Sequence, residues 1–147
     1  MTNSMNWNTF LACILQDFSC QTGTIHQSAN SDKTLTLVYQ IGVPETIMHQ
    51  IASIPFGKGI AGAAAERQEA VELCNLQQDL GGVAKAGARQ TGVSGSIAVP
   101  IFEKNSGEVI GTLGIGKFAP HEFSTAEKQR LREIAAEIAE IFMHKDS

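Results

Sequence analysis

The sequence predicts an α+β fold, with a central antiparallel sheet between a layer of terminal helices and a layer of shorter helices and loops. Apolar residues recur at three- and four-residue steps near both ends of the chain, which is the spacing of one helix face. The strand-like segments between these ends are joined in pairs by short turns, so the paired strands run antiparallel. Two terminal helices can cover one face of such a sheet, which leaves the middle of the chain for the other face.

The first predicted helix covers residues 3–18, where six apolar side chains share one face: Trp7, Phe10, Leu11, Ile14, Leu15 and Phe18. Two strands are expected next, at residues 24–27 and 35–39, because turn-forming residues 30–33 separate them. A short helix then follows, with Pro44 in its first turn.

The middle of the chain is predicted to hold short elements. They are a helix at residues 61–67, a strand at residues 70–73 and a loop with a helical portion at residues 75–91. Two longer strands follow, at residues 95–102 and 108–117. The connection between them is short and contains glycine, so they are expected to form an antiparallel hairpin.

The last predicted helix covers residues 125–143 and begins at a capping box formed by Ser124 and Glu127. Four residues on it step by three, four and three, which is the seam spacing of a coiled coil: Leu131, Ile134, Ile138 and Ile141. Other residues widen this stripe: Ala135, Ala139 and Phe142. A wide stripe can serve two partners, so we expect a homodimer through the four seam residues. The alternative, in which one helix face packs only on the sheet, needs the same residues.

Composition and charge restrict the class of protein. The 147 residues suit one domain with one core, so we expect a single domain over residues 1–147. The net charge of −4 argues against non-specific nucleic-acid binding, which needs a basic face. No apolar run is long enough to span a bilayer and no signal-peptide pattern is present, so we expect a cytoplasmic protein with no membrane partner. Cys13, Cys20 and Cys74 form no CxxC pair and are expected to be reduced thiols.

Residues 57–62 spell G-x-G-x-x-G, the pattern of dinucleotide-binding loops, but their surroundings argue against that function. Pro55 lies where the motif needs the interior of a buried parallel strand. Only residues 62–68 separate the motif from the next apolar segment, and a crossover helix needs a dozen or more. Asp79, the candidate ribose ligand, lies in a loop-like segment. Lys58 is followed by glycine, which excludes a Walker loop.

We therefore interpret the three glycines as residues that shape a turn and allow close backbone packing at a helix start. The first turn of a helix has unpaired N–H groups, which favour anions or carbonyl oxygens. A small ligand is therefore expected to contact the backbone near Ile60 and Ala61.

The motifs of the chain, taken together, resemble those of the GAF domain family. The resemblance covers nearly the whole chain in the family's order. It is carried by Ile54-Pro55-Phe56-Gly57-Lys58-Gly59-Ile60-Ala61-Gly62-Ala63-Ala64, by Ser94-Gly95-Ser96-Ile97-Ala98-Val99-Pro100-Ile101, by Val109-Ile110-Gly111-Thr112-Leu113-Gly114-Ile115, and by Phe123-Ser124-Thr125-Ala126-Glu127 with Leu131, Ile134 and Ala135. The resemblance implies a PAS-like sandwich whose terminal helices cover one sheet face and whose ligand pocket lies on the other.

GAF domains bind cyclic nucleotides, tetrapyrroles, haem, small anions or metabolites, and many have no known ligand; standalone ones often pair through their terminal helices. The sequence lacks the Asn-Lys-Phe-Asp-Glu set of the cyclic-nucleotide branch. In the bilin branch a cysteine holds the chromophore, often beside a histidine, but Cys74 is flanked by Leu73 and Asn75. A small buried thiol is the simpler interpretation of Cys74. The cofactor is left unknown.

The free methionine sulfoxide reductases are an enzyme branch that this fold resembles. Their chemistry needs cysteines in the region that corresponds to residues 87–94, which has none, and Ser96 stands where that branch has a carboxylate. The histidines form no metal-binding or catalytic pattern: His26, His49, His121 and His144. We therefore expect no catalytic residue and no metal site.

Strand alternation predicts which residues face a ligand. Ile97, Val99 and Ile101 share one face, with Val109, Leu113 and Ile115 of the next strand, and should meet the terminal helices. On that next strand Ile110, Thr112, Gly114 and Gly116 share the opposite face. The opposite faces are small or hydroxyl-bearing. These strand faces, the start of the helix in the glycine motif and the segment after the strand at residues 70–73 supply the expected ligand contacts: Ile60, Ala61, Cys74, Arg89, Ser96, Ala98 and Thr112. The alternative is that the small residues only allow the covering helices to approach closely.

These observations predict a non-catalytic GAF-like sensor that binds an unidentified small molecule and acts as a homodimer. Two alternatives stay open. One is a reductase-type enzyme that uses a displaced Cys74. The other is a ligand-free dimerisation module that regulates a partner.

Overall fold

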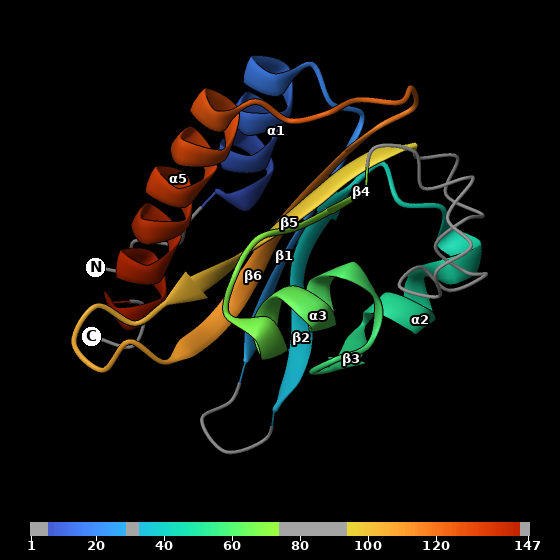
Figure 1. Cartoon of the computed structure of the whole chain (residues 1–147). Helices are drawn as coiled ribbons and strands as arrows, with labels where there is room; N and C mark the ends of the chain where they lie inside the picture. The colour runs from blue at the N-terminus through green and yellow to red at the C-terminus, as the bar shows by residue number, and fades with distance from the viewer. Residues whose placement is uncertain (1–5, 29–32, 74–93, 145–147) are drawn as a thin grey trace.

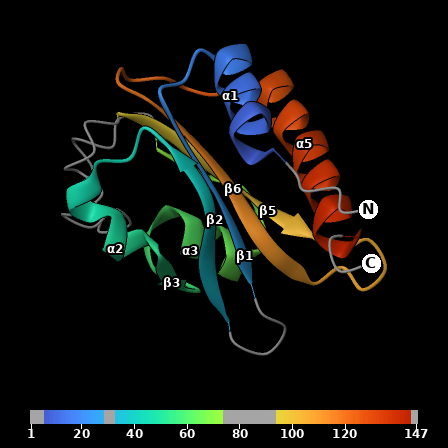
Figure 2. The same cartoon turned by 180° about the vertical axis from the view of Figure 1, so that it is seen from behind.

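The computed structural model of the chain describes residues 6–28, 33–73 and 94–144. A six-stranded antiparallel sheet lies between helices α1 and α5 on one face and helices α2 and α3 on the other (Figures 1 and 2). The helices are α1 (Trp7–Phe18), the 3-10 turn η1 (Glu45–Ile47), α2 (Met48–Ile51), α3 (Gly59–Arg67) and α5 (Thr125–His144). The strands are β1 (Thr22–Ser28), β2 (Thr34–Ile41), β3 (Ser53–Pro55), β4 (Val71–Leu73), β5 (Gly95–Phe102) and β6 (Val109–Lys117).

The strand order is β3-β2-β1-β6-β5-β4, so β1 and β6 lie at the centre of the sheet. These two strands come from opposite halves of the chain and pair antiparallel, with Ile25 opposite Leu113 and His26 opposite Thr112. The predicted hairpin of β5 and β6 is confirmed. The sequence did not predict β3, whose last residue is Pro55. This strand lies at an edge of the sheet, where the missing N–H of proline costs no ladder hydrogen bond.

The main hydrophobic core lies between the sheet and the two long helices, which lie side by side in both views (Figures 1 and 2). The sheet contributes five of the six residues that strand alternation assigned to this face: Ile97, Val99, Ile101, Leu113 and Ile115. Because each of them is at most 2% exposed, the predicted faces are confirmed for these five residues. At the start of β6 the prediction is wrong, since Ile110 and not Val109 packs against this core, next to a shift in the register of β5 and β6 after Ile101. The seam residues Leu131, Ile134 and Ile138 of α5 pack into the same core.

Helix α5 begins at the predicted capping box. The Ser124 amide donates to Oε1 of Glu127 at 2.8 Å, and the Glu127 amide donates to the Ser124 hydroxyl at 3.1 Å. His121 adds a contact of 3.1 Å between its Nε2 and the same carboxylate oxygen. Burial of the Glu127 carboxylate favours its protonation, but the hydrogen bonds from Ser124 and His121 outweigh burial and lower its pKa.

The edge strand β4 is fastened to the start of α5 through one carboxylate. Glu72 accepts a hydrogen bond from the Phe123 amide at 2.8 Å and pairs with the Lys128 ammonium at 2.7 Å. Both oxygens of Glu72 are therefore used, and the outermost strand is fixed relative to the long helix. On the other face of the sheet, a smaller core joins α3 to Val71 and Ala98 through Ala63 and Ala64.

Candidate ligand site

The candidate site lies at the centre of the sheet, on the face opposite α1 and α5. Ile25 and Leu113 point into the main core, so the next residues along their strands, His26 and Thr112, point to the opposite face. The same alternation places Thr24 and Gly114 beside them as a second cross-strand pair. Two polar pairs of neighbouring strands therefore make the middle of this face.

His26 is the most constrained polar residue of this face. It is 1% exposed, and its Nε2 lies 2.8 Å from the carbonyl oxygen of Ile51 in α2. A carbonyl oxygen only accepts, so Nε2 carries the proton and Nδ1 is left as an acceptor. Burial lowers the pKa of His26, and the hydrogen bond to Ile51 only partly opposes this effect. The imidazole is therefore neutral at pH 7.

Two buried polar atoms on this face have no hydrogen-bond partner in the described part of the chain: Nδ1 of His26 and Oγ1 of Thr112. Thr112 is 1% exposed, and the two residues lie directly opposite each other on β1 and β6. Buried polar groups are almost always hydrogen-bonded, because an unmade bond costs the desolvation of the group. Two buried polar atoms without a hydrogen-bond partner therefore lie together in one cross-strand pair at the centre of this face.

Beside this pair the sheet is only partly covered, at Gly114 on β6. A Cβ added to Gly114 would make a tight contact of 3.1 Å with the Thr24 hydroxyl oxygen and would lie 3.8 Å from the Ile97 carbonyl oxygen, and no other atom of the described residues would come within 4 Å. Gly114 and the nearby Ser96 on β5 are both partly exposed. The floor around Gly114 is therefore not filled by the side chains that the structure describes.

Helix α3 forms one side of the site and begins in the glycine motif. Gly57 and Gly59 have φ values of 91° and 70°, a backbone region that favours glycine. A Cβ on Gly62 would lie 2.5 Å from the carbonyl oxygen of Pro55, and the Gly57 amide donates to the Gly62 carbonyl at 2.7 Å. Backbone geometry alone therefore accounts for all three glycines, as the sequence analysis predicted. Ile60, at the helix start, is partly buried.

The structure brings most of the expected ligand contacts to this side of the sheet. Ser96 and Thr112 lie on the face around Gly114, and Ile60 and Ala61 form the first turn of α3. Ala98 packs on the alanines of α3, so close packing explains its small size. Cys74 and Arg89 lie outside the described residues.

Sequence reasoning missed His26 as a residue of the site. The available signal was the alternation of Thr24 and His26 in a short polar segment, which places both on one face of a strand. That face was not assigned because the segment has too few apolar residues to show which side is buried. Its direction follows only from the pairing of β1 with β6.

The protonation of His26 predicts how stability depends on pH. The folded pKa lies below the ordinary value of about 6.5, so the unfolded chain binds the proton more readily. The stability that the neutral His26 contributes is fully present above pH 6.5. It is lost as the pH falls through that value toward the lowered pKa of the folded protein. Urea unfolding between pH 7.5 and 5.5 should show a slope of up to about 1.4 kcal/mol per pH unit from this residue.

The matched control for this measurement is the exposed His49. We expect His26→Gln to reduce the slope and His49→Gln to leave it unchanged. Equal slopes in all three proteins would show that His26 is not buried as a neutral imidazole. Glu127 also contributes to acid sensitivity, but its lowered pKa places that loss below its ordinary value of 4.5.

The two described cysteines lie away from this face. Cys20 belongs to the main core, where burial raises the pKa of its thiol to about 11. The charge of Lys117 lowers this pKa, and the charge of Glu127 raises it. Cys13 is exposed on α1, on the other side of the sheet. Within residues 6–28, 33–73 and 94–144, no three His, Cys, Asp or Glu side chains gather in a way that could hold a metal ion.

None of the helices in the described ranges has the length and apolar character needed to cross a bilayer.

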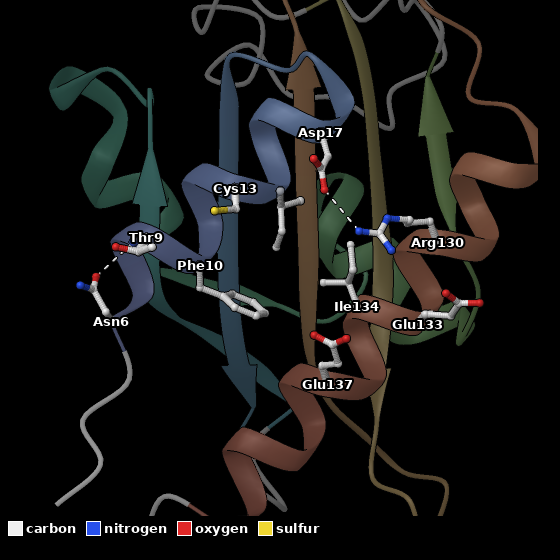
Figure 3. A pocket seen from close by; sticks show the side chains of 10 residues that line it. Asn6, Thr9, Phe10, Cys13, Asp17, Arg130, Glu133, Ile134 and Glu137 are labelled. Carbon is white, nitrogen blue, oxygen red and sulfur yellow. Dashed lines mark hydrogen bonds and ion pairs between the residues drawn. The ribbon is translucent and has the colours of Figure 1, made fainter.

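A hollow lies between α1 and α5, on the outer side of these helices. It is a groove of about 440 Å³ to which Phe10, Ile14 and Ile134 contribute apolar surface (Figure 3). Charged side chains surround it: Asp17, Arg130, Glu133 and Glu137. Figure 3 shows Arg130 reaching across from α5 to Asp17 on α1, with 3.3 Å between Nη2 and Oδ2.

The predicted dimer seam on α5 is largely occupied by contacts within the chain. Leu131, Ile134 and Ile138 are 1%, 6% and 0% exposed, and Ile141 is partly buried. The alternative to a dimer seam was that this helix face packs only on the sheet, and such packing accounts for Leu131, Ile134 and Ile138. Leu131 and Ile138 have almost no surface left for a second chain. The dimer itself stays a prediction.

Comparison with known proteins gives one consistent result for the fold. The GAF domain family model matches residues 9–143. The search of curated proteins matched none. Among solved structures, the GAF domain of a Coxiella burnetii phosphoenolpyruvate-protein phosphotransferase is 20% identical with a TM-score of 0.76, over 92% of this chain and 79% of that one.

Two further solved structures show the range of proteins with this fold. Free methionine-R-sulfoxide reductase from Neisseria meningitidis is 20% identical with a TM-score of 0.76, over 94% of this chain and 76% of that one. A domain of a sensor histidine kinase protein from Sinorhizobium meliloti 1021 is 15% identical with a TM-score of 0.73, over 97% and 94%. At these identities the likeness concerns the fold alone. The fold and the family match give the same answer: the chain belongs to the GAF domain family.

Proposed function

We propose that this chain is a sensory GAF domain that binds a small molecule on the sheet face opposite α1 and α5 and catalyses no reaction. The observation that carries the proposal is the pair of unpartnered buried atoms, His26 Nδ1 and Thr112 Oγ1, beside the uncovered floor at Gly114. The sensor-kinase domain of the same fold supports a signalling role. The expected place of action is the cytoplasm.

The placement of the thiols supports a function without catalysis. Sulfoxide reduction by cysteine needs a reactive thiolate beside the substrate. Cys20 lies in the core with a pKa raised to about 11, and Cys13 lies on the far side of the sheet. A reductase function is the second candidate, because two solved structures of this fold are free methionine-R-sulfoxide reductases. It would have to use Cys74, and a Cys74→Ser variant that ends turnover of free methionine sulfoxide would establish it.

Native mass spectrometry of the purified protein tests the sensor proposal. We expect the intact protein to carry a small molecule that is released when the same sample is denatured. His26→Ala should lose the extra mass, whereas the exposed His49→Ala should retain it. A clean mass of the bare chain in every preparation would contradict the sensor and favour a ligand-free dimerisation module.

We further propose that the homodimer forms through the groove between α1 and α5. Its apolar contribution from Phe10 and Ile134 supports such a contact, and the exposed Cys13 at its edge provides a probe (Figure 3). In a symmetric pair each copy contributes the same surface, and a two-fold axis through the groove close to Cys13 would bring its two copies within reach of a short cross-linker.

Cross-linking in a Cys74→Ser background measures this directly, because Cys20 is buried. We expect a short bismaleimide to give a covalent dimer through Cys13, and Phe10→Glu to abolish it. The control Phe118→Glu changes an exposed phenylalanine, 54% exposed, outside the groove and should leave cross-linking unchanged. A monomer by analytical ultracentrifugation, with no cross-link, would refute this contact.

A further inference from the structure

We propose that His26 and Thr112 bind an uncharged group of the ligand that presents a hydrogen-bond donor beside an acceptor, as a carboxamide or a cyclic amide does. The inference rests on the proposed function, because it names the chemical class of the molecule that the same sheet face would take. It goes further in assigning a partner to each of the two buried atoms.

The orientation of His26 sets the first requirement. Its Nε2 is fixed as a donor by the Ile51 carbonyl oxygen, 2.8 Å away, so only Nδ1 is free, and Nδ1 accepts. A ligand that meets it must therefore supply an N–H or O–H. An ionised carboxylate oxygen, or an unprotonated phosphate oxygen, only accepts and would be repelled by the Nδ1 lone pair.

Thr112 sets the second requirement. Its hydroxyl carries one hydrogen to donate and lies directly across from His26 in the register of β1 and β6. Side chains of directly opposite residues lie about 5 Å apart at Cβ, within reach of one small group. An amide edge satisfies both residues at once, because its N–H donates to Nδ1 and its C=O accepts from the Thr112 hydroxyl.

The described residues beside the pair offer no counter-charge for a strongly charged group. The neighbouring residues on the same face, Thr24, Ala98 and Pro100, carry no charge. His26 itself is neutral, so no described residue beside the pair can neutralise a bound ion. Burying an ion without a counter-charge costs far more than burying an amide. The geometry therefore favours a neutral molecule over its anionic analogue.

A purely structural role makes a different prediction. In that case the Thr112 hydroxyl donates to His26 Nδ1 and the pair satisfies itself without a ligand. Thr112→Val would then remove a real hydrogen bond and lower the melting temperature. If the hydroxyl has no partner in the free protein, the isosteric valine leaves the melting temperature unchanged or raises it.

Matched probe pairs test the ligand class. We would add nicotinamide or nicotinate, and uracil or orotate, to ¹⁵N-labelled protein and follow the His26 Nδ1 signal and the Thr112 amide by NMR. Nicotinamide or uracil should move both signals and bind at least about tenfold more tightly than its charged partner. Equal or tighter binding of the anions would overturn the inference, as would a His26 Nδ1 signal that no neutral probe moves at millimolar concentration.

Variants complete the test. Thr112→Val should weaken binding of the neutral probe about tenfold without lowering the melting temperature. Thr36→Val, an exposed threonine of β2, should change neither. A lower melting temperature with unchanged affinity for Thr112→Val would show a structural pair and overturn the inference. If native mass spectrometry finds a bound molecule but the neutral probes do not shift the His26 Nδ1 signal, the sensor proposal stands and only the ligand class is wrong.

Discussion

Ile138→Glu is expected to unfold the protein. Ile138 is 0% exposed in the core between α5 and the sheet, so the substitution buries an unpaired carboxylate and removes apolar packing. Such changes cost about 4 kcal/mol or more, a large part of the 5–15 kcal/mol by which typical domains are stable. Urea unfolding followed by circular dichroism should show no cooperative transition.

Two controls make this result specific to burial. Met143→Glu adds the same charge to the same helix at a residue that is 52% exposed, and it should change the unfolding free energy by less than about 0.5 kcal/mol. Ile138→Val should cost only about 1 kcal/mol, because it removes one methylene group. A folded Ile138→Glu protein with wild-type stability and a changed oligomeric state would show instead that Ile138 faces a partner chain.

Gly62→Val is expected to destabilise the protein by about 3 kcal/mol. The added Cβ would lie 2.5 Å from the Pro55 carbonyl oxygen and 3.1 Å from the Gly57 nitrogen, both backbone atoms that cannot rotate away. The start of α3 and the preceding turn would have to separate. Thermal and urea unfolding of the purified variant measure the loss.

Gly59→Ala separates this steric effect from backbone strain. A Cβ on Gly59 meets nothing within 4 Å, so this variant carries only the cost of a φ of 70°, about 1 kcal/mol. Gly62→Val should therefore be clearly the less stable of the two. Equal stabilities would show that close packing at Gly62 is not what the motif provides.

The fold could be predicted from the sequence because its strongest signals are local. The six-residue apolar face of α1, the capping box at Ser124 and the alternation on β5 and β6 each follow from residues close together in the chain. The same alternation correctly placed Val99 and Leu113 on the sheet face toward α1 and α5, and Thr112 on the opposite face. Edge strand β3 was missed because it is three residues long and ends in Pro55, which argues against a strand anywhere but at an edge.

The centre of the site could not be predicted in the same way. His26 and Thr112 are 86 residues apart in the sequence and meet only because β1 pairs with β6. The carbonyl group that orients His26 belongs to the backbone of Ile51, which leaves no trace in the sequence. On α5, a stripe that packs on a sheet and one that packs on a partner helix need the same residues. Periodicity therefore could not distinguish a dimer seam from a core face.

The central claim is that a small molecule binds on the sheet face opposite α1 and α5. The most direct test is to add a deproteinised small-molecule extract of the host cells to the ¹⁵N-labelled protein and map the amide shifts. We predict shifts concentrated at Thr24, His26, Thr112 and Gly114, with α1 and α5 unchanged. Shifts confined to the groove between α1 and α5, or no shifts at any concentration of extract, would contradict the claim.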